Sequence, residues 1–170
     1  MPEPRLTLVL GGARSGKSRH AEAMIEAFPA PWLYRATGQA FDTEMRQRID
    51  AHRARRGANW QVRETPLDLA AALDAAPEGH PVLVDCLTLW LSNVMLADRD
   101  AEADSARLAA TLGRPRGPWV VVANEVGLGI VPDNALARRF RDAAGWLNQR
   151  VAAAADAVVL MVAGLPLQVK

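Results

Sequence analysis

The chain has 170 residues, half of them hydrophobic, which is enough for one core and predicts that residues 1–170 form a single domain. Its 20 basic and 19 acidic residues leave a net charge of +1, so it lacks the overall positive field typical of nucleic-acid-binding proteins. It also lacks an export signal, a long apolar run and a second cysteine to pair with Cys86, and we therefore expect a cytoplasmic protein without a membrane span.

Short apolar runs alternate with longer helical patterns along the chain, which is typical of a parallel sheet between helices. The pattern predicts, in chain order, a strand over 6–10, a helix over 18–27, a strand over 32–36, a helix over 42–56, a strand over 60–63, a helix over 67–75, a strand over 82–85, helices over 87–96 and 101–112, a surface loop to residue 118, a strand over 119–124, a helix over 134–155 and a strand over 157–162. We expect an α/β fold with a mostly parallel central sheet and helices on both faces.

A complete phosphate-loop motif, G-x-x-x-x-G-K-[ST], follows the first predicted strand directly. Its glycines let backbone N–H groups turn toward phosphate oxygens, Lys17 adds a positive charge, and Ser18 offers a hydroxyl to Mg²⁺. Because the motif also opens a helix, the helix N-terminus favours the same anion. We therefore expect a P-loop NTPase-like fold whose nucleotide-binding residues include Gly11, Gly12, Ala13, Arg14, Ser15, Gly16, Lys17 and Ser18.

Asp85 ends the buried apolar strand over residues 82–85. Ligands of such sheets bind at the carboxyl ends of the strands, so this carboxylate is a candidate to complete a Mg²⁺ site with Ser18. The alternative, equally open from the sequence, is that Asp85 caps the following helix.

His52 lies at helical spacing from Met45 and Ile49, on the apolar side of a helix rich in arginine. Taken alone, this spacing favours a packed core histidine. The functional alternative is a neutral imidazole that attacks phosphorus. The arginines Arg46, Arg48, Arg53, Arg55 and Arg56 are either a solvated helix face or a patch that faces a polyphosphate.

Two further segments carry candidate residues. The run Asn124 to Pro132 leaves a valine-rich strand and enters a glycine-containing loop, which is either functional or a structural turn. Glu64, at the end of a shorter strand, is a weaker acidic candidate or a solvated edge residue.

These segments together resemble the family of bifunctional adenosylcobinamide kinases and adenosylcobinamide-phosphate guanylyltransferases. The resemblance spans nearly the whole chain. The residues that carry it are Gly11–Glu22, Phe41-Asp42, Glu44-Met45, Arg48-Ile49, His52-Arg53, Asp85–Asn93 and Asn124–Pro132. The last two segments are more specific than the phosphate loop, which many unrelated enzymes share.

The resemblance implies phosphorylation of adenosylcobinamide by ATP or GTP, followed by transfer of GMP from GTP to that phosphate. It implies that His52 carries GMP as a covalent intermediate and that the protein is a homotrimer with a corrinoid substrate. Lys17 is expected to be catalytic because its charge would stabilise the charge that develops on phosphate oxygens. It also implies nucleotide contacts at Ala36, Thr37, Gly38, Arg53, Ala54, Arg55, Arg56, Glu64 and Asp85.

Two departures from the family pattern stand out. Arg35 occupies a strand position that is usually aliphatic, so this position is either exposed or part of a different guanine environment. The segment over residues 97–118 is shorter than in some members of the family, so whether it contacts another subunit or the corrinoid is an open question.

Two rival interpretations are a kinase in which His52 only packs and a nucleotide-switch protein. The segment over 124–132 and the lack of an N-K-x-D motif disfavour the switch.

Overall fold

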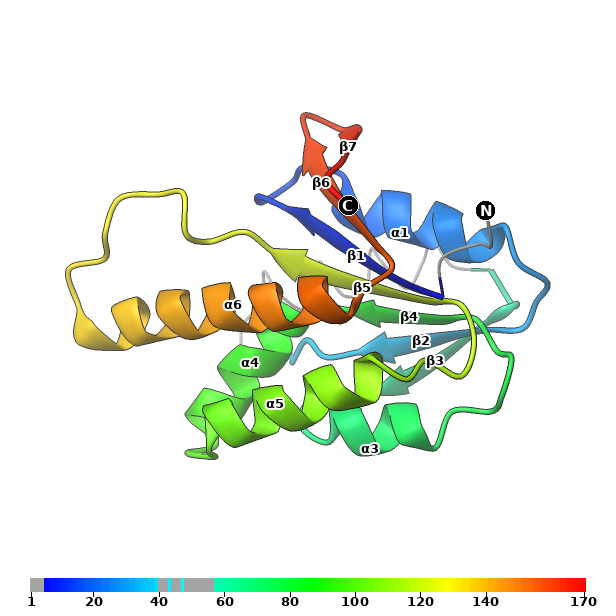
Figure 1. The fold of residues 1–170 in the computed structure, drawn as a ribbon, viewed down its shortest axis with the longest axis horizontal. Coiled ribbons are helices and arrows are strands. Elements are labelled where there is room, and N and C mark those ends of the chain that lie inside the picture. Colours follow the sequence, from blue (N-terminus) through cyan, green and yellow to red (C-terminus); the bar gives the residue numbers. More distant parts are fainter. Residues whose placement is uncertain (1–4, 40–42, 44–46, 48–56) are drawn as a thin grey trace.

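The computed structural model describes residues 5–39, 43, 47 and 57–170. Over these residues it shows one seven-stranded sheet with helices on both faces (Figure 1). The strands are β1 (Leu6–Gly11), β2 (Trp32–Ala36), β3 (Trp60–Glu64), β4 (Val82–Asp85), β5 (Trp119–Asn124), β6 (Ala157–Val162) and β7 (Leu165–Gln168).

The described helices agree with the predicted ones to within two residues at each end. They are α1 (Lys17–Glu26), α3 (Leu69–Asp74), α4 (Leu87–Leu96), α5 (Ala101–Leu112) and α6 (Ala135–Ala154). The helix expected over residues 42–56 falls almost wholly outside the described residues and stays a prediction. None of the helices found in the described residues has the length and apolar character needed to cross a membrane.

The strands are arranged in the order β3-β2-β4-β5-β1-β6-β7. All neighbouring pairs up to β6 are parallel, which confirms the predicted fold class, and β7 pairs with β6 in the antiparallel direction. The sequence did not predict β7. It is four residues long, exposed at each of them, and contains Pro166, a residue that sheets accept mainly on edge strands.

The carboxyl ends of the parallel strands meet at one edge of the sheet. Gly11 of β1 pairs with Asn124 of β5, and Ala36 of β2 lies between Glu64 of β3 and Asp85 of β4. Candidate residues that are far apart in the chain therefore gather at this edge, as the parallel topology requires.

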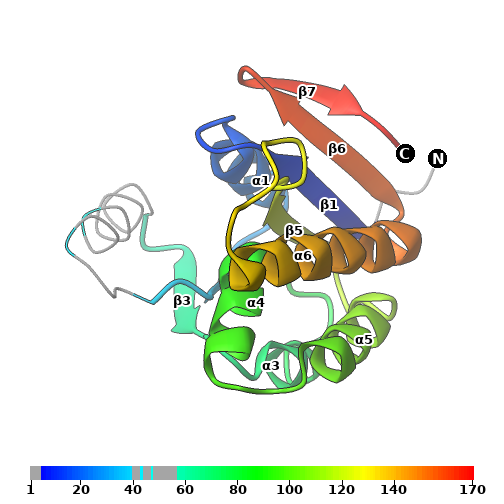
Figure 2. The ribbon, with the colours of Figure 1, turned by 90° about the vertical axis from the view of Figure 1, so that its left-hand side faces the viewer.

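The two faces of the sheet are buried by different helices (Figure 2). Because side chains alternate along a strand, Val9 and Leu83 pack with α1, whereas Leu8 and Val84 pack in the larger core formed with α3, α4, α5 and α6. Helix α1 begins directly after the phosphate loop, so the packing of α1 against β1, β4 and β5 fixes the loop relative to the sheet edge.

Candidate functional site

The phosphate loop is a tight turn between β1 and α1. A Cβ on Gly11 would collide with the Ser15 hydroxyl oxygen and would lie 3.0 Å from the Met161 carbonyl oxygen, so only glycine fits. Gly16 has a φ of +91°, a conformation that side chains disfavour. The loop also rests on the turn between β6 and β7, because the Gly164 N–H donates to the Ser15 carbonyl oxygen at 3.1 Å.

The start of α1 differs from the starts of α5 and α6. Asp100 and Asn134 cap those two helices by accepting hydrogen bonds from Ala103 N and Ala137 N. The residue in the same position before α1 is Gly16, which has no side chain to do so. The first N–H groups of α1 are therefore left for another acceptor, and a phosphate placed there would satisfy them.

Lys17 folds back over the loop, and its Nζ donates to the Gly12 carbonyl oxygen at 2.8 Å. Burial lowers the pKa of Lys17 below its ordinary value, and the negative charge of Asp85 partly opposes that shift. A partly desolvated ammonium group attracts phosphate more strongly than a fully hydrated one. Lys17 is thus a positive charge held inside the loop, with Asp85 on the same side of the sheet.

Asp85 is half-buried at the end of β4 and accepts a hydrogen bond from the Tyr34 hydroxyl at 2.9 Å. The described residues contain no cluster of three or more His, Cys, Asp or Glu side chains that could hold a metal alone. Mg²⁺ commonly takes one or two protein ligands and completes its shell with phosphates and water. One carboxylate at Asp85 and one hydroxyl at Ser18, beside a phosphate loop, fit that requirement.

Thr37 is fully buried, and its polar atoms all have partners within the protein. Its hydroxyl donates to the Cys86 carbonyl oxygen at 2.7 Å and accepts from the Cys86 N–H at 2.8 Å. Its N–H donates to the Asp85 carbonyl oxygen, and its own carbonyl oxygen accepts from Asn93 Nδ2 at 2.7 Å. Thr37 therefore ties β2 to the turn between β4 and α4, and in this structure it offers a nucleotide no free polar atom.

The other expected contacts around Thr37 are better placed to reach a ligand. Ala36 and Gly38 are partly exposed on either side of it, and Glu64 is exposed at the neighbouring end of β3. By contrast, Arg35 points to the opposite face of the sheet, where its guanidinium group donates to the Ala72 carbonyl oxygen of α3 at 3.0 Å. The alternative of an exposed Arg35 is wrong, since the residue is half-buried; burial and nearby Arg63 lower its pKa.

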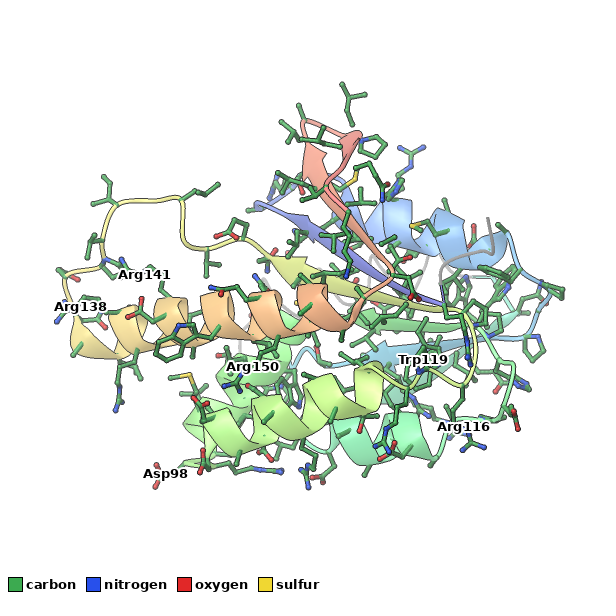
Figure 3. All side chains as sticks on the ribbon, in the orientation of Figure 1. Asp98, Arg116, Trp119, Arg138, Arg141 and Arg150 are labelled. Atoms are coloured by element: carbon green, nitrogen blue, oxygen red, sulfur yellow. The ribbon has the colours of Figure 1, made fainter. Side chains whose placement is uncertain are left out.

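The segment after β5 begins at the phosphate loop and then leaves the body of the protein (Figure 1). The Glu125 N–H donates to the Gly11 carbonyl oxygen at 3.0 Å, and the Gly127 N–H donates to the Glu125 carboxylate. At the far end, near the start of α6, Arg138 donates to the Pro132 and Asp133 carbonyl oxygens; Arg138 is labelled in Figure 3. Between these anchors the apolar side chains are exposed: Val126, Leu128, Ile130 and Val131.

Five of the expected site residues lie outside the described residues. They are His52, Arg53, Ala54, Arg55 and Arg56, so the predicted nucleophile and arginine patch stay predictions. Gly12, Ala13 and Arg14 are exposed in the phosphate loop, and Ser18 is partly buried in the first turn of α1.

Sequence reasoning gave no role to Tyr34 or to Asn93. Asn93 Nδ2 also donates to the Pro66 carbonyl oxygen at 3.0 Å, so it links the chain after β2 and β3 to α4. A signal for Tyr34 was present: it is the chain's single tyrosine, and it precedes Ala36 by two residues, which places both on one face of β2.

The comparison with protein families decides what kind of protein carries this arrangement. The model of the cobinamide kinase / cobinamide phosphate guanyltransferase family matches residues 7–169. The chain belongs to this family. The predicted class, a bifunctional kinase and guanylyltransferase with a P-loop NTPase-like fold, is thereby confirmed.

Individual relatives agree over nearly their whole length. The bifunctional adenosylcobalamin biosynthesis protein CobP of Pseudomonas aeruginosa is 49% identical over 166 residues, which cover 96% of each protein. The bifunctional adenosylcobalamin biosynthesis protein CobU of Salmonella typhimurium is 43% identical, and the match covers 97% of this chain and 99% of that protein. A solved ATPase of a bacterial type III secretion system has a TM-score of 0.58 at 11% identity, over 93% of this chain and 51% of its own, and shows the fold alone.

Proposed function

We propose that this chain phosphorylates adenosylcobinamide with ATP or GTP and then transfers GMP from GTP to the new phosphate, giving adenosylcobinamide-GDP. The observation that carries the proposal is the phosphate loop with Lys17 folded into it beside Asp85, in a chain that belongs to this family. The loop supplies N–H donors and one cation that would bind phosphates. Membership of the family indicates that cobinamide accepts the transferred phosphate.

In the kinase step, the substrate hydroxyl oxygen bonds to the γ-phosphorus while the bond from that phosphorus to the β-phosphate oxygen breaks. The nucleoside diphosphate leaves, and the hydroxyl proton passes to solvent or to a nearby base. Lys17 and the N–H groups of residues 11–18 stabilise the charge on the phosphate oxygens. Mg²⁺, held by Ser18 and Asp85, would neutralise further charge on the β- and γ-phosphates.

In the guanylyltransferase step, an imidazole nitrogen of His52 bonds to the α-phosphorus of GTP and pyrophosphate leaves. The phosphate of adenosylcobinamide phosphate then attacks the same phosphorus and releases His52. This division into two displacements avoids a direct meeting of two highly charged phosphates. Nucleotide contacts at Ala36, Gly38, Glu64 and the arginines over residues 53–56 are part of the proposal.

The corrinoid needs an exposed apolar surface or a subunit interface, because its ring is large. We place it on the loop after β5, where Leu128 is 88% exposed and Ile130 is 98% exposed. The loop starts at Glu125, whose N–H is bonded to the phosphate loop itself. The start of this loop is therefore next to the residues that would bind the triphosphate.

The proposal also covers the oligomeric state and the cellular compartment. The protein is expected to act as a homotrimer, which light scattering of the purified protein would test by a mass three times that of the chain. It is expected to work in the cytoplasm. The single cysteine, buried in the described core, fits a compartment where disulfides are rare.

Product analysis by mass spectrometry tests the two steps separately. With GTP and adenosylcobinamide, the unmodified protein should form adenosylcobinamide-GDP, and His52→Asn should stop at adenosylcobinamide phosphate. Lys17→Ala should slow both steps by about a hundredfold or more, since it removes a charge that stabilises both transition states. If His52→Asn still forms the GDP product, or if the unmodified protein forms no phosphorylated corrinoid, the proposal is wrong.

A further inference from the structure

Among the residues that the structure describes, Tyr34 forms a side-chain hydrogen bond with the carboxylate of Asp85. Its hydroxyl donates to Asp85 Oδ2 at 2.9 Å, and the residue is only 5% exposed. The two residues stand on neighbouring parallel strands, where Tyr34 pairs with Leu83 and Ala36 pairs with Asp85. Tyr34 therefore reaches diagonally across the pair toward the edge of the sheet that carries the phosphate loop.

The ring of Tyr34 is held in place by its surroundings. It packs in the core under α1 with Val9, Ala21 and Ile25. Its ring also meets Trp60 edge-on, with centroids 5.9 Å apart and an interplanar angle of 80°. Trp60 is fixed in turn by a hydrogen bond from its Nε1 to Glu26 at 3.0 Å. A buried ring with these contacts has little freedom to move, so its hydroxyl is a fixed donor.

A fixed donor on one oxygen of a carboxylate determines where the other oxygen points. Asp85 Oδ2 is taken by Tyr34, which leaves Oδ1 for a cation or a water molecule. Asp85 ends β4 at the sheet edge where β1 ends at Gly11 and the phosphate loop begins, since β5 pairs with both strands. Groups that orient metal ligands in this way commonly change metal affinity by tenfold or more when removed.

We propose that Tyr34 is a positioning residue, which orients the carboxylate of Asp85 toward the Mg²⁺ that accompanies the bound nucleotide. Tyr34 touches neither nucleotide nor metal; it acts through Asp85. The proposal rests on the proposed nucleotide site. The two proposals can fail separately. Binding of GTP without metal tests the nucleotide site, whereas binding of the metal to the protein with GTP tests the role of Tyr34.

The main experiment measures binding rather than turnover. Mn²⁺, a paramagnetic substitute for Mg²⁺, is titrated into the protein with saturating GTP and followed by electron paramagnetic resonance. Tyr34→Phe keeps the ring and removes only the donor, and we expect it to weaken Mn²⁺ binding about tenfold. GTP affinity measured with EDTA present should stay within about twofold of the unmodified protein. Equal Mn²⁺ affinity in a folded Tyr34→Phe protein would overturn the proposal.

A double-mutant cycle separates positioning from packing. Asp85→Asn alone should weaken Mn²⁺ binding, and adding Tyr34→Phe to it should weaken that binding no further, because the carboxylate on which Tyr34 acts is gone. If the two losses multiply instead, Tyr34 acts by another route and the proposal is wrong. Trp60→Phe serves as the packing control, since it disturbs the ring contact and leaves the hydroxyl in place.

The unmodified protein offers a readout that needs no variant. Tyr34 is the only tyrosine in the chain, so the tyrosine bands in an ultraviolet resonance Raman spectrum report on this one hydroxyl. Adding Mg²⁺ to the protein with bound GTP should shift these bands, because the metal draws charge from the carboxylate that accepts the hydrogen bond. Bands that do not move when Mg²⁺ binds would contradict the proposal even if Tyr34→Phe failed to fold.

Discussion

Lys17 shows how burial prepares a residue for phosphate binding. Its pKa is lowered by desolvation, so its ammonium group loses its proton at a lower pH than an ordinary lysine. The charged form binds phosphate, and GTP affinity should therefore fall as the pH rises from 8 toward 10.5, by about ten- to hundredfold once the charge is lost.

Calorimetric titration of GTP at several pH values would measure this fall. Lys17→Arg is the matched control, because a guanidinium group keeps its charge over this range; its GTP affinity should be weaker but nearly independent of pH. A fall of the same size in Lys17→Arg would assign the pH dependence to another group.

Cys86 shows the opposite effect of burial. Desolvation, with a smaller contribution from Asp85, raises the pKa of its thiol to about 12. Because only the thiolate reacts readily, the native protein at pH 8 should react with a thiol reagent at least about a hundredfold more slowly than the unfolded chain. Absorbance of the released thiol product would follow the reaction. Equal rates before and after unfolding would show that Cys86 is accessible and ionised.

At the scale of elements, the connection between β2 and α4 depends on the Thr37 hydroxyl. Thr37→Val would leave the buried Cys86 N–H without its acceptor, which should lower the free energy of unfolding by about 1–3 kcal/mol. Thr37→Ser keeps the hydroxyl and should lose less than half of that. Urea unfolding would measure both.

The same two variants decide whether Thr37 also binds nucleotide. The resemblance to the family implies a contact, whereas the structure engages its polar atoms within the protein. We expect GTP affinity at a temperature where both variants are folded to differ by less than about threefold. A large loss of affinity in Thr37→Val without a loss of stability would mean that Thr37 is a direct ligand.

Much of this level of structure could be predicted. The strands from β1 to β6 follow from short apolar runs, three of them preceded by Pro31, Pro81 or Pro118, and the parallel order follows from the helices between them. The position of the phosphate loop follows from its motif. The network of Thr37, Cys86 and Asn93 could not be predicted, because it joins residues about 50 apart that meet only when β2 pairs with β4. Strand β7 gave no periodic signal over four exposed residues.

At the scale of the whole molecule, one sheet separates two cores. Strands β2, β4, β5, β1 and β6 each contribute side chains to both of them. Loss of either core would disrupt strands that also support the other core. Calorimetry at fixed protein concentration should therefore show one cooperative unfolding transition. GTP at a hundred times its Kd should add about 2.7 kcal/mol, or roughly 5–10 °C.

The control for this stabilisation is Lys17→Ala, which should show a much smaller shift with GTP at the same concentration. Two separate transitions in the unmodified protein would contradict the single domain predicted for residues 1–170. An equal shift in Lys17→Ala would mean that GTP binds elsewhere than the phosphate loop.

The proposed mechanism requires one chain that binds GTP at the phosphate loop and passes GMP through His52. Incubation with GTP labelled at the α-phosphorus tests it most directly. We predict a label on the protein that is lost in acid and forms together with pyrophosphate. The label should be absent from His52→Asn and should move to the corrinoid when adenosylcobinamide phosphate is added. A protein that phosphorylates adenosylcobinamide yet takes up no label would contradict the claim.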